Sequence, residues 1–170
     1  MIAGPSIVRV AVPADEAELW VLLRMMHSEA AICSMSETKI QSFLDRTLRP
    51  ETIPTDDIGP RGIIGVIGKP SQLEAAIMLV LSSAWYSDEI VMMDALNFVH
   101  PDYRQSNHAK TLIAYAKHIV DEIRKTHLDF KMVMDIASTK RTQAKIRLFR
   151  RQLPEVGAVF VYPAPEGIAT

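Results

Sequence analysis

The chain has 170 residues, of which 48% are hydrophobic and 23% charged, a composition that predicts one globular domain over residues 1–170. The single cysteine, Cys33, excludes disulfides within the chain and cysteine-based zinc sites, and we expect it to be a small buried residue. No apolar run is long enough to span a bilayer, and the first residues lack the pattern of a secretory signal. We therefore expect a cytoplasmic protein with no membrane partner.

The net charge of −1 conceals an asymmetry along the chain. Residues 1–103 carry a net charge of −7, and residues 104–170 carry a net charge of +6. A basic half can serve nucleic acid or a small polyanion, but such charges more often belong to solvated helix faces. The charge by itself therefore does not predict a nucleic-acid partner.

The hydrophobic pattern predicts both strands and helices. Short apolar runs indicate strands, and apolar residues that recur three and four positions apart indicate helices. In chain order we predict strand Ile7–Val12, helices from Glu16 and from Ser36 or Glu37, strands Gly62–Gly68, Leu73–Tyr86 and Ile90–Val99, helix Asn107–Lys125, strand Lys131–Ala137, helix Thr142–Gln152 and strand Ala158–Tyr162. The short connections between the three consecutive strands imply antiparallel pairing. The predicted order is β-α-α-β-β-β-α-β-α-β, which is that of an α/β (α+β) chain.

The glycines and histidines form no nucleotide or metal motif. Gly62, Gly65 and Gly68 precede Lys69, but their spacing fits neither the Walker nor the Rossmann fingerprint. Glycines that bend a strand or relieve its packing explain this run better. The five histidines form no HExxH motif and no i, i+4 pair, so we expect no metal site.

Residues 96–113, with the sequence LNFVHPDYRQSNHAKTLI, carry most of the functional information. A strand ends at Val99, Pro101 stops it, and a polar loop with two cations opens a helix near Asn107. The unpaired backbone amides at a helix start and the helix dipole together favour an anion such as a phosphate. A helix cap by Ser106 or Asn107, with no ligand, is the alternative.

This segment resembles the GNAT superfamily of acetyl-CoA-dependent N-acetyltransferases, in which a strand and Tyr-Arg precede a loop of the form Arg/Gln-x-x-Gly-x-Gly/Ala and a long helix. Phe98–Arg104 match the lead-in, Arg104 and Ala109 match the ends of the loop motif, and Asn107 stands where glycine is usual. The strand KMVMDIAS and the Ala-x-x-x-Leu-Phe pattern at Ala144–Phe149 extend the resemblance over nearly the whole chain. It implies a mostly antiparallel central sheet flanked by helices, with acetyl-CoA and an amine acceptor as partners. The sequence leaves a homodimer as one possible assembly.

The resemblance also implies which residues hold acetyl-CoA. Its diphosphate would rest on the loop amides and the helix start, its pantetheine arm would pair with the end of the strand, and the last helix would flank its other side. The cofactor-binding residues so implied are Leu96, Asn97, Phe98, Val99, Arg104, Gln105, Ser106, Asn107, His108, Ala109, Lys110 and Phe149. Asparagine is the residue that best tolerates left-handed backbone after glycine, so Asn107 can take the place of the family's glycine.

The implied reaction is direct attack of an amine on the acetyl group, which needs a base for the amine and a proton for the departing thiolate. Asp94 and His100 are the candidate bases, and a solvated strand carboxylate and an ordinary loop histidine are the alternatives. Asn97 is a third candidate catalytic residue, which could bond either the substrate or the backbone of the sheet.

The thiolate's proton donor departs from the family pattern, because Phe149 stands where many members have a tyrosine. Tyr162, Tyr115 or water would have to replace it. A GNAT-like domain that binds acyl-CoA without catalysis, or that uses its basic half to bind nucleic acid or protein, is therefore the alternative function.

Overall fold

The computed structural model describes residues 7–30, 33–54, 56–57, 59–83, 86–136 and 142–157. Five strands form one sheet in the order β1-β2-β3-β4-β5. The strands are β1 (Arg9–Val10), β2 (Gly62–Lys69), β3 (Gln72–Ser83), β4 (Ile90–Val99) and β5 (Lys131–Val133). The helices are α1 (Glu16–Ala30), α2 (Glu37–Leu48), α3 (His108–Arg124) and α4 (Thr142–Arg150), with 3-10 turns at Pro13–Asp15, Pro50–Thr52 and Pro101–Tyr103.

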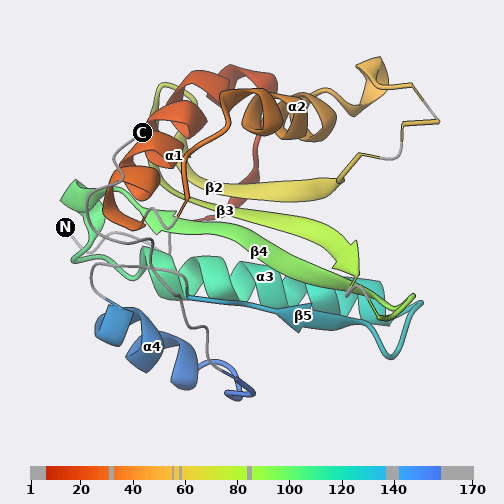
Figure 1. Ribbon diagram of the computed structural model, residues 1–170. Helices are drawn as coiled ribbons and strands as arrows, with labels where there is room; N and C mark the ends of the chain where they lie inside the picture. The colour runs from red at the N-terminus through yellow and green to blue at the C-terminus, as the bar shows by residue number, and fades with distance from the viewer. Residues whose placement is uncertain are drawn as a thin grey trace, which may run out of the picture.

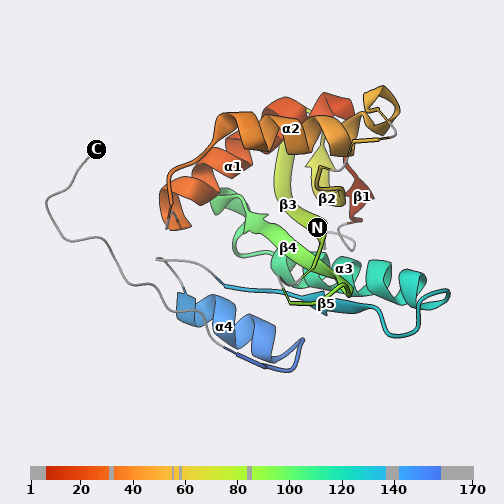
Figure 2. The same ribbon diagram turned by 45° about the vertical axis from the view of Figure 1, so that its right-hand side comes forward.

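The helices are divided between the two faces of the sheet. Figure 1 shows α1 and α2 on one face and α3 on the other, while Figure 2 shows α4 beyond β5. Every neighbouring pair of strands is antiparallel except β4 and β5, which are parallel. The predicted mixed, mostly antiparallel fold is confirmed from the first strand to the last helix. The predicted strand Ala158–Tyr162 lies outside the described residues.

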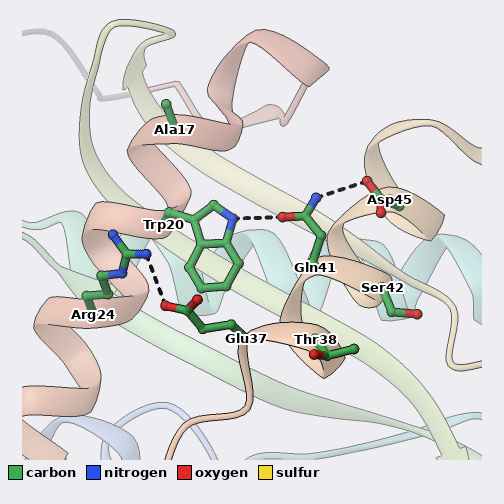
Figure 3. A pocket seen from close by; sticks show the side chains of 8 residues that line it. All are labelled: Ala17, Trp20, Arg24, Glu37, Thr38, Gln41, Ser42 and Asp45. Carbon is green, nitrogen blue, oxygen red and sulfur yellow. Dashed lines mark hydrogen bonds and ion pairs between the residues drawn. The ribbon is translucent and has the colours of Figure 1, made fainter.

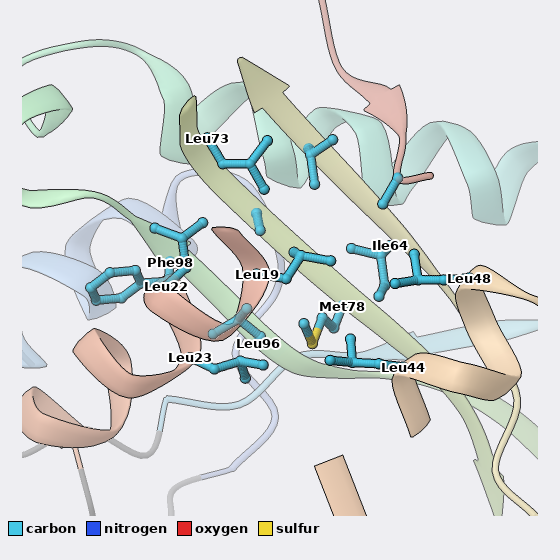
Figure 4. Close-up of a cluster of buried hydrophobic side chains, with 13 residues drawn as sticks. Leu19, Leu22, Leu23, Leu44, Leu48, Ile64, Leu73, Met78, Leu96 and Phe98 are labelled. Carbon is cyan, nitrogen blue, oxygen red and sulfur yellow. The ribbon is translucent and has the colours of Figure 1, made fainter. Parts of the chain in front are cut away.

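Two hydrophobic clusters pack on the two faces of the sheet, because side chains alternate along each strand. Met78 of β3 faces Leu19 of α1 and Leu44 of α2, a cluster drawn in Figure 4. The next residue, Leu79, faces the opposite way and packs with Leu112 of α3. The sheet is therefore buried on both faces, which fixes the register of β3 between its helices.

Glycine has a defined structural role where β2 turns into β3. The pairing of these strands shifts register between Ile67 and Gly68, and Gly68 has a φ of +109°. A Cβ atom added there would lie 2.4 Å from the backbone oxygen of Gln72. The prediction that this run of glycines bends a strand and relieves packing is confirmed at this position.

Three predicted strands are longer in the sequence pattern than in the structure. The first covers only Arg9–Val10, β3 ends at Ser83 rather than at Tyr86, and β5 ends at Val133 rather than at Ala137, which is itself outside the described residues. Among the described residues, β5 pairs only with Val91–Met93 of β4. Among the described residues, no helix combines the length and the apolar composition needed to cross a membrane.

Candidate active site

The site begins where β4 and β5 separate. They pair only along Val91–Met93 and Lys131–Val133, and the pairing of β4 with β3 skips Ala95. This extra residue is a β-bulge, which bends a strand and locally increases its twist. Past the bulge, β4 continues to Val99 without a partner strand on its β5 side among the described residues. Within the part of the chain that the structure describes, this edge of β4 is therefore open.

A cavity of about 710 Å³ lies along this open edge. Its walls come from α1 and the segment after it, from β4, from the loop and first turn of α3, from the end of β5 and from α4. The lining residues are Met26, His27, Glu29, Cys33, Asp94, Ala95, Leu96, Asn97, Phe98, Val99, Arg104, Ser106, Asn107, Ala109, Lys110, Asp135, Ile136, Ala144, Lys145, Leu148, Phe149, Arg151 and Gln152. From Asp94 to Val99, β4 spans about 16 Å at strand geometry, so the cavity suits an extended ligand.

Most of the residues predicted to hold acetyl-CoA line this cavity. They are Leu96, Asn97, Phe98, Val99, Arg104, Ser106, Asn107, Ala109, Lys110 and Phe149. Gln105 and His108 are not among the lining residues; Gln105 is exposed, and the His108 side chain is buried against Glu74 of β3. The cofactor role of each of these residues stays a prediction, but the structure brings most of them to one place.

The start of α3 differs from the expected geometry at Asn107. We expected asparagine to replace glycine in a left-handed conformation, but Asn107 has φ −87° and ψ 11°, so this expectation is wrong. The loop is closed instead by side chains, because the His108 amide donates to Ser106 Oγ at 3.2 Å. The Thr111 amide donates to the Asn107 carbonyl at 3.0 Å, which is a hydrogen bond of the regular helical type. The amides of Ala109 and Lys110 come before it, at the start of the helix, where backbone amides have no partner within the helix.

The Arg104 side chain faces protein groups. Its Nη2 donates to Glu29 Oε1 at 2.5 Å, its Nε donates to the Val99 carbonyl at 3.3 Å, and its guanidinium lies 5.4 Å from the centre of the Phe98 ring. The contact with Glu29 ties the loop before α3 to the last turn of α1. Arg104 therefore connects two walls of the cavity, a role that the loop motif does not predict.

Asp94 is the candidate base that the structure brings to the cavity. Burial raises the pKa of its carboxyl to about 7, opposed by the Asp135 amide, which donates to Asp94 Oδ1 at 3.0 Å. The Asp135 carboxylate raises that pKa further, and the Lys145 ammonium lowers it. A carboxyl with such a pKa exchanges protons near neutral pH, as a general base must.

The other two catalytic candidates have different surroundings. Asn97 lines the cavity, and its Nδ2 is buried without a hydrogen-bond partner among the described residues. His100 does not line the cavity; its Nδ1 accepts the Asp102 amide at 3.3 Å, and its ring lies edge-on to Tyr103. A buried amide without a partner is a group that a ligand can satisfy, so Asn97 fits a polar ligand in this cavity.

The structure does not bring a tyrosine from the described residues to the position of a proton donor. Phe149 lines the cavity, whereas Tyr115 lies against Gly65 and Val8 and does not line it. Burial raises the pKa of the Tyr115 phenol, which further opposes its ionisation. Tyr162 lies outside the described residues.

Sequence reasoning missed the wall formed by α1 and the residue that follows β5. Glu29 lies in the last turn of α1, where a negative charge is unfavourable for the helix dipole, and this unfavourable position could have indicated a role outside the helix. Asp135 lies shortly after β5, and no feature of the sequence indicates that it lines the cavity. Cys33 was expected to be buried, which is wrong: its side chain is exposed and lines the cavity, because the chain leaves α1 at this edge.

A second cavity, of about 890 Å³, lies between α1 and α2 (Figure 3). Trp20 Nε1 donates to Gln41 Oε1 at 3.1 Å, and Gln41 Nε2 donates to Asp45 Oδ1 at 3.0 Å. Arg24 Nη2 pairs with Glu37 Oε1 at 3.1 Å. These polar groups already bond one another, and none of the predicted site residues lines this cavity.

Neither a family profile nor a curated protein matches this sequence. Solved structures do match its fold. The ribosomal-protein-alanine N-acetyltransferase of Brucella melitensis biovar Abortus 2308 matches with a TM-score of 0.61 and 12% identity, over 93% of this chain and 98% of that one. An aminoglycoside acetyltransferase, meta-AAC0020, from an uncultured soil metagenomic sample matches with a TM-score of 0.60 and 12% identity, over 94% and 96%.

A third matching structure contains a ligand. AAC(6')-Iy in complex with the bisubstrate analogue CoA-S-monomethyl-acetylneamine matches with a TM-score of 0.61 and 14% identity, over 94% of this chain and 97% of that one. At such identities the likeness concerns the fold, and it extends over nearly the whole length of each chain. The chain therefore has the fold of the GNAT superfamily of N-acetyltransferases, as residues 96–113 predict.

Proposed function

We propose that this protein transfers an acyl group, in the first place acetyl, from acyl-CoA to a primary amine. One observation carries the proposal: a single cavity runs along the open edge of β4 from Asp94 to the first turn of α3. An anion-binding helix start and a carboxyl that titrates near neutral pH therefore lie on the same ligand-sized cavity. The GNAT fold of the chain agrees with this reading.

The residues present fit acyl-CoA, whose thioester supplies the acyl group. At the start of α3, the cavity is lined by Ser106, Asn107, Ala109 and Lys110. Backbone amides, the helix dipole and the Lys110 ammonium favour a diphosphate there. The open backbone edge of β4 up to Val99 provides hydrogen-bonding groups for an amide-bearing arm.

The reacting end of the cavity is assigned to Asp94, Ala95 and Asn97. Asp94 accepts the proton that the attacking amine loses as its nitrogen bonds the acyl carbon and the carbon–sulfur bond breaks. The Asn97 amide can donate to the carbonyl oxygen that gains negative charge. Since Phe149 has no proton to give, the departing thiolate takes its proton from water.

Calorimetry with acetyl-CoA tests the binding part of this proposal. We expect saturable heat at micromolar to high micromolar ligand, and folded protein without heat in that range would contradict the proposal. Lys110→Glu should weaken binding by about tenfold without lowering stability, because an acid in the first helical turn is favourable for the helix dipole. Lys39→Glu, at an exposed position on α2, is the matched control and should bind as the wild type does.

Binding without transfer is a second candidate function, and one observation favours it: Phe149 lines the cavity in place of a proton-donating tyrosine. Release of free thiol from acetyl-CoA, measured across a panel of amines, separates the two functions. Amine-dependent release supports catalysis, whereas saturable binding without release supports a binding module.

A further inference from the structure

The loop between β4 and α3 is attached at both ends to one residue of β3. At its first residue, the His100 amide donates to the Glu74 carbonyl at 2.8 Å. At the other end, the first residue of α3, His108, has its Nε2 at 2.6 Å from Glu74 Oε2. The His108 side chain is 7% exposed and that of Glu74 is 30% exposed, so water competes little for the histidine. Glu74 therefore holds the two ends of the loop with its backbone and its carboxylate.

The middle of the loop packs onto the same pair. The Tyr103 ring stacks on the His108 ring with 6.1 Å between centres and an interplanar angle of 29°. Gln72, two residues before Glu74 on β3, donates from Nε2 to the Tyr103 hydroxyl at 3.0 Å. Tyr103 in turn accepts the Ser106 amide at its carbonyl at 3.0 Å. These contacts leave the loop few alternative conformations.

Neither Glu74 nor His108 lines the cavity, yet His108 directly precedes Ala109 and Lys110, which do. This loop contains no glycine, and Asn107 keeps a negative φ. The path of its backbone is therefore set by the 3-10 turn at Pro101–Tyr103 and by side-chain contacts, rather than by a residue that favours left-handed geometry. Preorganised amides bind an anion more tightly than amides that must first be ordered.

We propose that Glu74 and His108 are positioning residues, which clamp this loop so that the amides at the start of α3 are held ready for the diphosphate of acyl-CoA. The inference rests on the proposed function. It states that the clamp strengthens binding of the diphosphate and does not affect binding of the rest of the ligand. The part of the ligand that lies along β4 contacts residues that the clamp does not touch.

A comparison of two ligands tests the clamp. Acetyl-CoA carries the diphosphate, and S-acetylpantetheine carries the same thioester arm without it. Ligand-observed NMR, which suits weak binding, gives both affinities. Glu74→Ala should weaken acetyl-CoA by about tenfold, the effect of losing one hydrogen bond to a charged group, and should leave S-acetylpantetheine unchanged. Glu74→Gln keeps an oxygen acceptor for His108 and should stay close to the wild type.

Controls separate this effect from a loss of folding. Glu122→Ala removes an exposed carboxylate that pairs with Lys125 at the far end of α3, and it should change neither affinity. If Glu74→Ala does not fold, His108→Ala makes the same test from the other partner. Equal weakening of both ligands, no weakening of acetyl-CoA, or a Glu74→Gln variant as weak as Glu74→Ala would overturn the clamp. A wild-type protein that binds neither ligand would overturn the proposed function and the clamp with it.

Discussion

The carboxyl of Asp94 has opposite effects on stability and on the proposed chemistry. Its pKa is raised from 3.8 to about 7, so the folded chain retains a proton between those pH values that the unfolded chain has lost. The contribution of Asp94 to stability therefore falls as the pH rises through that range. The same pKa means that a substantial fraction of Asp94 is ionised at neutral pH and can accept the proton of the attacking amine.

Asp94→Asn should lower the rate of amine-dependent thiol release by about a hundredfold, because a positioned base contributes at least that much. The variant should also unfold at a higher temperature than the wild type at pH 8, with little difference near pH 4. Its amide oxygen can still accept the Asp135 amide, so this hydrogen bond is kept. Equal activity, or lower stability at pH 8, would contradict this account.

The pH dependence of the rate provides an independent check on Asp94. The wild-type rate should rise with pH through about 7, where Asp94 loses its proton. Asp135→Asn removes a charge that raises this pKa, so the rise should shift to lower pH. A profile that is unaffected by this substitution would exclude Asp94 as the group that titrates.

Asn97 has a buried Nδ2 without a hydrogen-bond partner in the described part of the chain, which makes its substitution informative. Asn97→Leu removes this unsatisfied buried donor, so it should not lower the free energy of unfolding. We expect catalytic efficiency with acetyl-CoA to fall about tenfold, since a donor to the developing oxyanion is lost. A large loss of stability with unchanged activity would instead indicate a structural role.

At the scale of elements, the pair of Arg104 and Glu29 joins the loop before α3 to the last turn of α1. Both side chains are about one-fifth exposed, and Glu29 opposes the dipole of α1. Arg104→Ala should therefore cost about 1–2 kcal/mol of stability, between the values for exposed and buried pairs. Chemical denaturation measures the loss. The double variant Arg104→Glu, Glu29→Arg should lose less stability than its two single variants, Arg104→Glu and Glu29→Arg, lose together. A loss equal to the sum of the two single losses would contradict the pairing.

The sequence predicts the elements better than it predicts their ends. Helix α1 begins at Glu16 and β4 spans Ile90–Val99 as the pattern indicates, because periodicity and proline fix those boundaries. The end of β5 depends instead on where β4 bends away at Ala95, a relation between two distant segments. Local patterns do not contain that relation.

At the scale of the whole molecule, residues 96–113 predict both the fold and the place of the site, since one local motif joins the strand, the loop and the helix. The wall that contains Glu29 and Cys33 could not be predicted, because it forms only when α1 packs beside β4. The side-chain contacts of Arg104 and His108 likewise come from segments far away in the chain. Spacing therefore leads to the cavity that we propose as the site, whereas tertiary contacts decide what each side chain touches there.

A crystal structure with acetyl-CoA tests the central claim most directly. We predict that the diphosphate contacts the amides of Ala109 and Lys110, and that the acetyl group lies beside Asp94 and Asn97. A ligand bound between α1 and α2, or one whose thioester lies away from Asp94, would contradict the proposed site.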